Sequence, residues 1–165
     1  MRKIFLVSLF VMSIFVLISC TTITAVQKAG NYSLTLPAKY EYNTAESMNA
    51  EPGCVGVFVD SKNHLPELWV YSFNTNGRSL ETFVAEKASE FNTDKAAVFN
   101  DYNINGQLLK GAVIEFDENW YNTKYYNYYY IVKMNDGTFM CLDFACNPDS
   151  PAKSLKAVET VLCRI

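Results

Sequence analysis

Several short segments of the chain carry the apolar, β-branched and aromatic residues that are typical of β-strands. The first is Tyr32 to Leu36, which ends at Pro37. Two more, Val55 to Asp60 and Leu68 to Asn74, flank the turn-like stretch Ser61 to Pro66. We expect these two to pair through an enlarged hairpin loop, and we expect a loop between the first strand and the second.

Two further hairpins are predicted in the second half of the chain. Asn105 and Gly106 join Val98–Ile104 to Gln107–Phe116, and this dipeptide supplies the positive φ angles that a tight hairpin turn requires. The second hairpin joins Tyr125 to Met134 with Thr138 to Cys146. Its connection has turn chemistry as well, with Asn135, Asp136 and Gly137.

Two segments have the three- and four-residue spacing of an amphipathic helix. The first begins after Ser79, a good N-cap, and its apolar positions are Leu80, Phe83, Val84, Ala88 and Phe91. The second begins with Pro151 at the first helical position, after Asp149 or Ser150, and its apolar face holds Ala152, Leu155, Val158, Val161 and Leu162.

The order of these elements predicts an α+β fold. Hairpins favour an antiparallel sheet, and amphipathic helices need a sheet face that covers their apolar stripe. We therefore expect a central antiparallel sheet of about six or seven strands, flanked by two helices. A chain of 165 residues has room for one ordinary core, so residues 31–165 are predicted to form a single domain.

The first thirty residues have the pattern of an export signal. Arg2 and Lys3 precede an apolar run from Ile4 to Ile18. The sequence Leu17-Ile18-Ser19-Cys20 then resembles the lipobox of bacterial lipoproteins. That resemblance implies a signal peptide over residues 1–19, cleavage before Cys20 and attachment of lipid to the Cys20 sulfur.

The lipid would tie the protein to a membrane of the bacterial cell envelope, on the periplasmic or the outer surface. Residues 20–30 are then expected to be a polar tether. Two alternatives remain open, because an uncleaved span from Ile4 to Val26 could cross a bilayer and an ordinary secretory signal would release the chain.

Several phrases of the sequence resemble the PsbP-like superfamily. They are Tyr32-Ser33-Leu34 with Pro37, the helix start Ser79-Leu80-Glu81, the turn Asn103 to Gly106, the strand Gly111 to Phe116, and Tyr129 to Phe144 followed by a helix. The group includes the extrinsic photosystem II subunit, the Ran-binding Mog proteins and small bacterial lipoproteins. The resemblance implies an α/β/α sandwich with a central antiparallel sheet. The group has no catalytic signature, so the resemblance does not name a function.

The composition excludes some classes of protein. Half the residues are apolar and 19% are charged, which indicates a folded chain rather than a disordered one. The net charge is −3, and Lys and Arg are scattered singly from Lys28 to Arg164. Nucleic acid is not an expected partner, because binding to phosphate backbones needs a clustered basic face.

Patterns that could support metal binding or catalysis are weak. Asp101, Asn103, Asn105 and Gly106 match the first half of a calcium loop, but Ala112 stands where the loop needs a bidentate Glu, which favours the hairpin. No metal or cofactor is therefore expected.

The single histidine, His64, falls in a predicted surface loop. Glu115 and Asp117 share one face of a strand, so a hydrolase with two carboxylates is a third hypothesis. A non-enzymatic protein is the main prediction.

Four cysteines remain after lipidation: Cys54, Cys141, Cys146 and Cys163. Cys141 and Cys146 differ by an odd number of residues, so they face opposite sides of one strand and do not chelate one metal together. A helix that returns along the sheet favours a disulfide between Cys141 and Cys163. Free buried thiols are the alternative.

Aromatic residues gather in one stretch, with six of the eleven tyrosines between positions 121 and 130. Tyr126, Tyr128 and Tyr130 alternate onto one face, where a helix is expected to bury them. Sheet core is the main explanation of the stretch. The functional alternative is a surface for a ligand or partner, formed by Trp120, Tyr121, Tyr125 and Tyr129.

Three functional hypotheses follow. The first is a non-enzymatic binding or assembly module that contacts another protein of the cell envelope. The second is a module that captures a carbohydrate or small apolar molecule by aromatic stacking, because amphipathic rings suit such sites. The third is the hydrolase.

Overall fold

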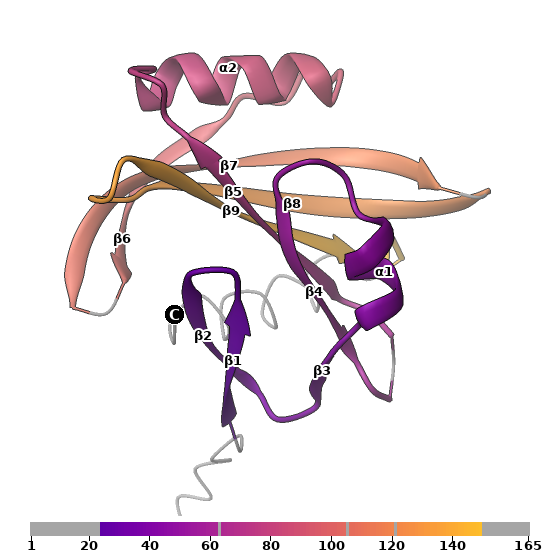
Figure 1. The fold of residues 1–165 in the computed structure, drawn as a ribbon. Helices are drawn as coiled ribbons and strands as arrows, with labels where there is room; N and C mark the ends of the chain where they lie inside the picture. Colours follow the sequence, from indigo (N-terminus) through magenta and orange to yellow (C-terminus); the bar gives the residue numbers. More distant parts are fainter. Residues whose placement is uncertain (1–23, 63, 105, 121, 150–165) are drawn as a thin grey trace, which may run out of the picture.

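The computed structural model describes residues 24–62, 64–104, 106–120 and 122–149 (Figure 1). Its centre is a seven-stranded sheet in the order β3-β4-β5-β9-β8-β7-β6, in which every neighbouring pair is antiparallel. The strands are β3 (Tyr40–Tyr42), β4 (Cys54–Asp60), β5 (Glu67–Asn74), β6 (Val98–Ile104), β7 (Gln107–Trp120), β8 (Thr123–Lys133) and β9 (Thr138–Cys146). The predicted antiparallel sheet is confirmed.

The predicted hairpin turns join the strands as expected. Ile104 lies opposite Gln107, so Asn105 and Gly106 connect β6 to β7 directly. The pair β7–β8 extends further than predicted, with Trp120 opposite Thr123 at its end. Trp120 therefore belongs to a strand, whereas we expected it in a connection.

A separate two-stranded hairpin lies below the sheet in Figure 1. It consists of β1 (Thr24–Ala29) and β2 (Tyr32–Pro37), which are antiparallel. The segment expected as a tether, residues 20–30, is therefore a strand from Thr24 onward. The sequence did not predict this strand, because its lysine and glutamine interrupt the apolar pattern. Pairing with β2 and the burial of Ala29 stabilise it in the folded protein.

The segment between β2 and β4 was expected to be a loop, and it contains two short elements instead. They are β3 and the six-residue helix α1 (Thr44–Asn49). The helix begins at the N-cap Asn43, whose side chain accepts a hydrogen bond from the Glu46 backbone N–H at 3.1 Å. Helices this short carry little periodicity, so the pattern of apolar residues did not predict α1.

Helix α2 (Leu80–Glu90) forms where the sequence predicts it and lies across one face of the sheet (Figure 1). The Ser79 side chain caps it by accepting a hydrogen bond from Thr82 N. Leu80, Phe83 and Val84 are buried, and Phe83 stacks on Phe139 of β9 with ring centroids 4.3 Å apart. Within the described residues, no helix has both the length and the apolar character of a membrane span.

The second helix, expected after Pro151, lies outside the described residues. Among those residues α2 is the long helix on the sheet, so the fold is mostly β, and the helix layer is described on one face only. Opposite α2, the β1–β2 hairpin and the tyrosines Tyr128 and Tyr130 belong to one buried cluster, and the Tyr32 hydroxyl of the hairpin hydrogen-bonds with Ser72 and Thr138. The helix that we expected over Tyr126, Tyr128 and Tyr130 is not tested, because the segment after Pro151 lies outside the described residues.

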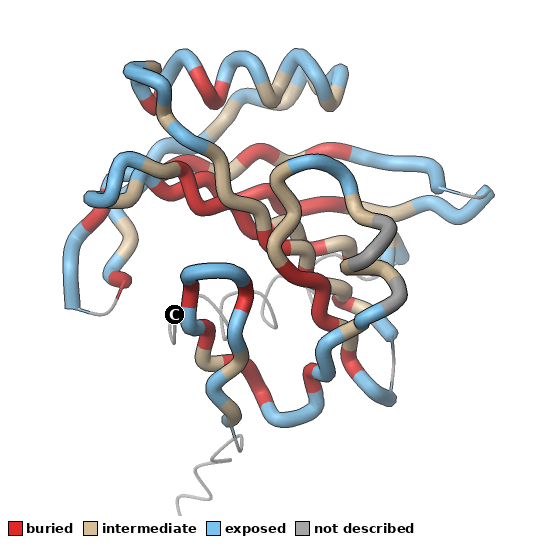
Figure 2. The backbone as a smooth tube through the Cα atoms, in the orientation of Figure 1, coloured by how far each residue is buried: buried red, intermediate tan, exposed pale blue. Residues whose placement is uncertain are grey.

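Two groups of buried residues occupy the two faces of the sheet (Figure 2). One lies between the sheet and the β1–β2 hairpin and includes Leu34, Phe58 and Phe144. The other lies under α2 and includes Phe83 and Phe139. Strand β7 is buried or half-buried from Gly111 to Phe116 and exposed from Asp117 to Trp120, where the β7–β8 hairpin projects beyond α2.

Candidate functional site

Part of the α2 face of the sheet carries aromatic and acidic side chains. Register places them on one face, because Trp69 of β5 lies opposite Asp143 of β9, which in turn lies opposite Tyr129 of β8. On the neighbouring pair Glu118 of β7 lies opposite Tyr125 of β8. We call this surface the aromatic patch and define it as Glu67, Trp69, Tyr71, Glu118, Trp120, Tyr125, Asn127 and Asp143.

The two tryptophans of the chain meet in the aromatic patch. The rings of Trp69 and Trp120 are 5.9 Å apart at their centroids and cross at 70°, an edge-to-face contact. Strands β5 and β7 are separated by β9 and β8, a span of about 14 Å at about 4.8 Å per strand. The contact therefore joins two strands that are not neighbours in the sheet.

In the aromatic patch, two side-chain oxygen atoms are shielded from solvent and have no hydrogen-bond partner in the described part of the chain. They are Oδ1 of Asn127 and Oδ1 of Asp143. Asn127 is fully buried, and its Nδ2 donates to Glu118 Oε2 at 3.0 Å. Buried acceptors without donors cost free energy, so these two oxygens mark a place where a donor from outside would be stabilising.

The carboxylates of the aromatic patch lie close enough to repel one another. Burial raises the pKa of Asp143 well above its usual value, and the negative charges of Glu118, Glu67 and Glu51 raise it further. Burial also raises the pKa of Glu67, although a hydrogen bond from Trp69 lowers it in part. Glu67, Glu118 and Asp143 form no salt bridge with any of the described residues. The patch therefore has a local excess of negative charge.

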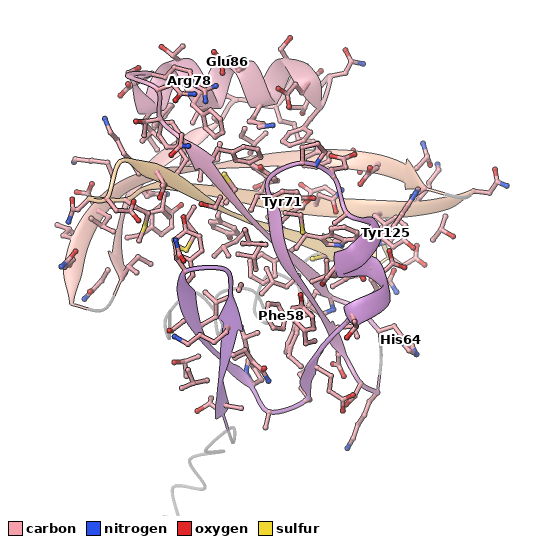
Figure 3. The ribbon with its side chains drawn as sticks, in the orientation of Figure 1. Phe58, His64, Tyr71, Arg78, Glu86 and Tyr125 are labelled. Carbon is pink, nitrogen blue, oxygen red and sulfur yellow. The ribbon has the colours of Figure 1, made fainter. Side chains whose placement is uncertain are left out.

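Burial also raises the pKa of the Tyr71 hydroxyl, with Asp143 as the next largest cause. Tyr71 and Tyr125 are both partly exposed, and Figure 3 labels them on strands β5 and β8. The Tyr71 ring lies 6.2 Å from the ring of Tyr129 and stacks at 6.0 Å on Phe73. Tyr71 thus connects the aromatic patch to the core beneath α2.

The surface expected from the sequence is assembled in part. Trp120 is 40% exposed and lies in the aromatic patch with Tyr125. Tyr129 is buried under α2, where Phe91 contacts its ring at 4.8 Å, so it belongs to the core. Tyr121 lies outside the described residues.

Sequence reasoning missed the contributions of β5 and β9 to this surface. Trp69 and Tyr71 alternate with buried Leu68 and Val70 along β5, which places them on the opposite face. The alternation of apolar residues along β5 could have predicted that Trp69 and Tyr71 share a face. It could not have predicted that Asp143 lies next to Trp69, because that contact depends on the order of strands in the sheet.

Other candidates from the sequence have structural partners. Tyr126 donates a hydrogen bond to the Glu115 carboxylate, and Asp117 forms an ion pair with Lys95 at 3.3 Å. Asp101 lies opposite Lys110 in the β6–β7 hairpin and pairs with it at 2.7 Å. His64 is exposed in the loop before β5. In the described ranges, no group of three or more His, Cys, Asp or Glu side chains is arranged to hold a metal ion.

An open hollow of about 840 Å³ lies at the start of α2, next to the β6–β7 hairpin. It is lined by Leu80, Glu81, Phe99 and Lys110, among others. The Lys110 ammonium is already paired with Asp101. We therefore place the candidate site at the aromatic patch. There, the Glu67, Glu118 and Asp143 carboxylates form no salt bridge with the described residues, and two buried oxygens accept no hydrogen bond from them.

Cys54 and Cys141 are free thiols in the described part of the chain, and Cys146 is buried. Cys141 is fully buried on the α2 face, and burial raises the pKa of its thiol to about 12 although a hydrogen bond from Tyr129 lowers it. Cys163, the partner expected for Cys141, lies outside the described residues.

Comparisons with known proteins find similarity at the level of structure. A scan against protein-family models finds no match, and a search of curated proteins finds none. A crystal structure from Bacteroides thetaiotaomicron VPI-5482 is similar with a TM-score of 0.58 and 12% identity over 86% of this chain. The chain spans 46% of the length of that protein.

The solution structure of cyanobacterial PsbP (CyanoP) from Synechocystis sp. PCC 6803 is also similar. Its TM-score is 0.53 at 16% identity, and the match covers 86% of this chain and 91% of that one. Identities this low show a shared fold and carry no function. The PsbP-like fold expected from the sequence is thus supported.

Proposed function

We propose that this protein is a lipid-anchored component of the bacterial cell envelope that binds a partner protein through the aromatic patch and catalyses no reaction. The observation that carries the proposal is the edge-to-face contact between Trp69 and Trp120. The Trp120 side chain lies at the end of β7 and remains 40% exposed. Tryptophan and tyrosine are the residues that most often dominate binding energy at protein interfaces.

The anchor in this proposal is the lipid at Cys20. The lipobox sequence Leu17-Ile18-Ser19-Cys20 supports it. Diacylation holds a chain at a membrane far more firmly than a single acyl chain does. Mass spectrometry of membrane fractions tests this part of the proposal, since a Cys20→Ala protein that is still cleaved at the same site and membrane-bound would contradict lipidation.

A pull-down from envelope extracts tests the binding role. The bait is the full-length protein in detergent, and Trp120→Ala is the variant. Phe99→Ala is a matched control, because Phe99 is 49% exposed on β6, outside the patch. We expect Trp120→Ala to lose the captured protein and Phe99→Ala to retain it. Equal capture by all three baits would refute the patch as the binding surface.

A carbohydrate is the second candidate ligand, and the exposed Trp120 ring next to the carboxylate of Glu118 favours it. Sugars stack on such rings, and their hydroxyl groups donate hydrogen bonds to such carboxylates. A glycan array distinguishes the two candidates. Binding of a defined glycan that Trp120→Ala abolishes, with no protein captured, would replace the first proposal with the second.

A further inference from the structure

The aromatic patch combines three features that select the same chemical class of ligand. Its carboxylates form no salt bridge with the described residues. Two oxygens that are shielded from solvent have no hydrogen-bond donor among those residues, and aromatic rings lie in the same patch. A ligand that fits must bring positive charge, hydrogen-bond donors and a flat surface that stacks on rings. The guanidinium group of arginine has all three properties.

We propose that the aromatic patch binds an arginine side chain presented by the partner protein. This inference rests on the proposed function and names the chemistry of the partner. Trp69 and Trp120 would contact the planar cation, as aromatic faces attract guanidinium groups. Asp143, with Glu118 beside it, supplies the acceptors for the N–H groups.

Geometry favours arginine over lysine and over a sugar. Asp143 and Asn127 each have one oxygen without a donor, and they project from neighbouring strands β9 and β8 on the same face. A guanidinium has five N–H donors in a fixed plane, so it can reach two acceptors at once. A sugar hydroxyl brings donors but no charge to offset the repulsion among Glu67, Glu118 and Asp143.

The other charged group near the patch does not supply this cation. His64 lies near Glu67 and lowers the pKa of that carboxyl, whereas the pKa of Asp143 is raised by burial and then by the negative charges of Glu118, Glu67 and Glu51. Lys95 contacts the other face of the β7–β8 hairpin, with its ammonium 4.3 Å from the ring centre of Tyr126. The positive charge must therefore come from outside the described residues.

Intrinsic fluorescence tests the inference directly, because both tryptophans of the chain lie in the patch. The probes are the blocked pentapeptide acetyl-Gly-Gly-Arg-Gly-Gly-amide and the same peptide with citrulline, which keeps the shape but removes the charge. The protein is the full-length chain in detergent. We expect a saturable change in tryptophan emission with the arginine peptide and binding at least about tenfold weaker with the citrulline peptide.

Two variants assign the binding to the carboxylates. Asp143→Asn and Glu118→Gln should each weaken binding of the arginine peptide, by about tenfold for Asp143. Glu118 is exposed, so its variant is expected to fold even if Asp143→Asn does not, and circular dichroism checks both. Asp94→Asn, at an exposed carboxylate outside the patch, is the control and should bind as the wild type does.

Equal responses to the arginine and citrulline peptides would overturn the inference. The same holds if neither peptide produces a response, or if neither carboxylate variant weakens the binding of the arginine peptide. A response to N-acetylglucosamine trimer alone would assign the patch to carbohydrate. If the arginine peptide fails while Trp120→Ala still loses its captured protein, the proposed function stands and only the arginine chemistry falls.

Discussion

Trp69 and Trp120, which are 51 positions apart in the sequence, contact each other edge to face, and Trp69 lies opposite Asp143 in the sheet. The contact joins strand β5 to the far end of the β7–β8 hairpin, across two other strands. Asn127 is fully buried at the point where the β7–β8 hairpin changes from buried to exposed, opposite the buried Phe116. The stability of the hairpin end and the shape of the binding surface therefore depend on the same pair of rings.

The ring contact predicts a measurable coupling between the two tryptophans. In a double-mutant cycle of Trp69→Ala and Trp120→Ala, the free energies of unfolding should differ from additivity by about 0.5–1.5 kcal/mol, as edge-to-face pairs do. Urea unfolding followed by circular dichroism measures it. Strict additivity would mean that the rings do not interact in solution.

The pKa of Asp143 predicts a dependence of stability on pH. Folding raises this pKa above the unfolded value of about 3.9. At pH values between the unfolded and the folded pKa, Asp143 is therefore protonated in the folded state and ionised in the unfolded state. The contribution of Asp143 to the free energy of unfolding is therefore most favourable below about pH 4 and decreases as pH rises to the folded pKa. Asp143→Asn should gain stability relative to the wild type over that window. Parallel pH curves for the two proteins would contradict the raised pKa, and Asp94→Asn is the control.

Phe83 is predicted to hold α2 on the sheet. It is 2% exposed and stacks on Phe139, while Arg78 lies 4.8 Å from the centre of its ring. Phe83→Ala should lower the free energy of unfolding by about 3–5 kcal/mol, since it leaves a cavity between helix and sheet. Phe99→Ala, at an exposed ring, should cost less than about 1 kcal/mol. Similar losses in both variants, measured by urea unfolding, would mean that α2 does not depend on this contact.

Gly111 is predicted to tolerate no side chain. A Cβ atom there would lie 2.5 Å from the Ile131 carbonyl oxygen and 2.7 Å from the Tyr102 ring. Gly111→Ala should therefore lower the melting temperature by an amount that corresponds to about 1–3 kcal/mol. Gly56→Ala is the matched control, because its nearest neighbour would be the Ala29 Cβ at 3.2 Å, and a smaller loss is expected. A larger loss for Gly56→Ala would contradict the packing described at Gly111.

The free thiols predict a labelling order. Cys54 is half-buried, whereas Cys141 and Cys146 are fully buried and the pKa of Cys141 is raised to about 12. Iodoacetamide at pH 8 should label Cys54 first in the native protein, since the thiolate is the reactive form. After unfolding, a count of four thiols in the lipidated chain would show that no disulfide forms. A count of two would show one disulfide, and peptide mapping would then decide whether it is the expected pair Cys141 and Cys163.

Local sequence signals predicted most elements of the sheet and α2. The Ser79 cap and the apolar spacing after it fixed the start and face of α2, because a helix is specified by residues within a few positions of one another. The turns at Asn105-Gly106 and Asn135 to Gly137 joined the expected strands for the same reason. Strand β1 and helix α1 escaped prediction, since neither has an apolar pattern that is clear on its own.

The candidate site was predicted less completely than the fold. Aromatic clustering in the sequence pointed to Trp120 and Tyr125, but Tyr129 is core and Trp69, Asn127 and Asp143 were not anticipated. The sequence by itself determined which face of each strand a residue takes, because side chains alternate along a strand. Only the tertiary structure decided which strands are neighbours, and this order sets Asp143 beside Trp69 and brings Trp120 into contact with Trp69. Strand order depends on contacts between distant segments, so no local pattern of residues encodes it.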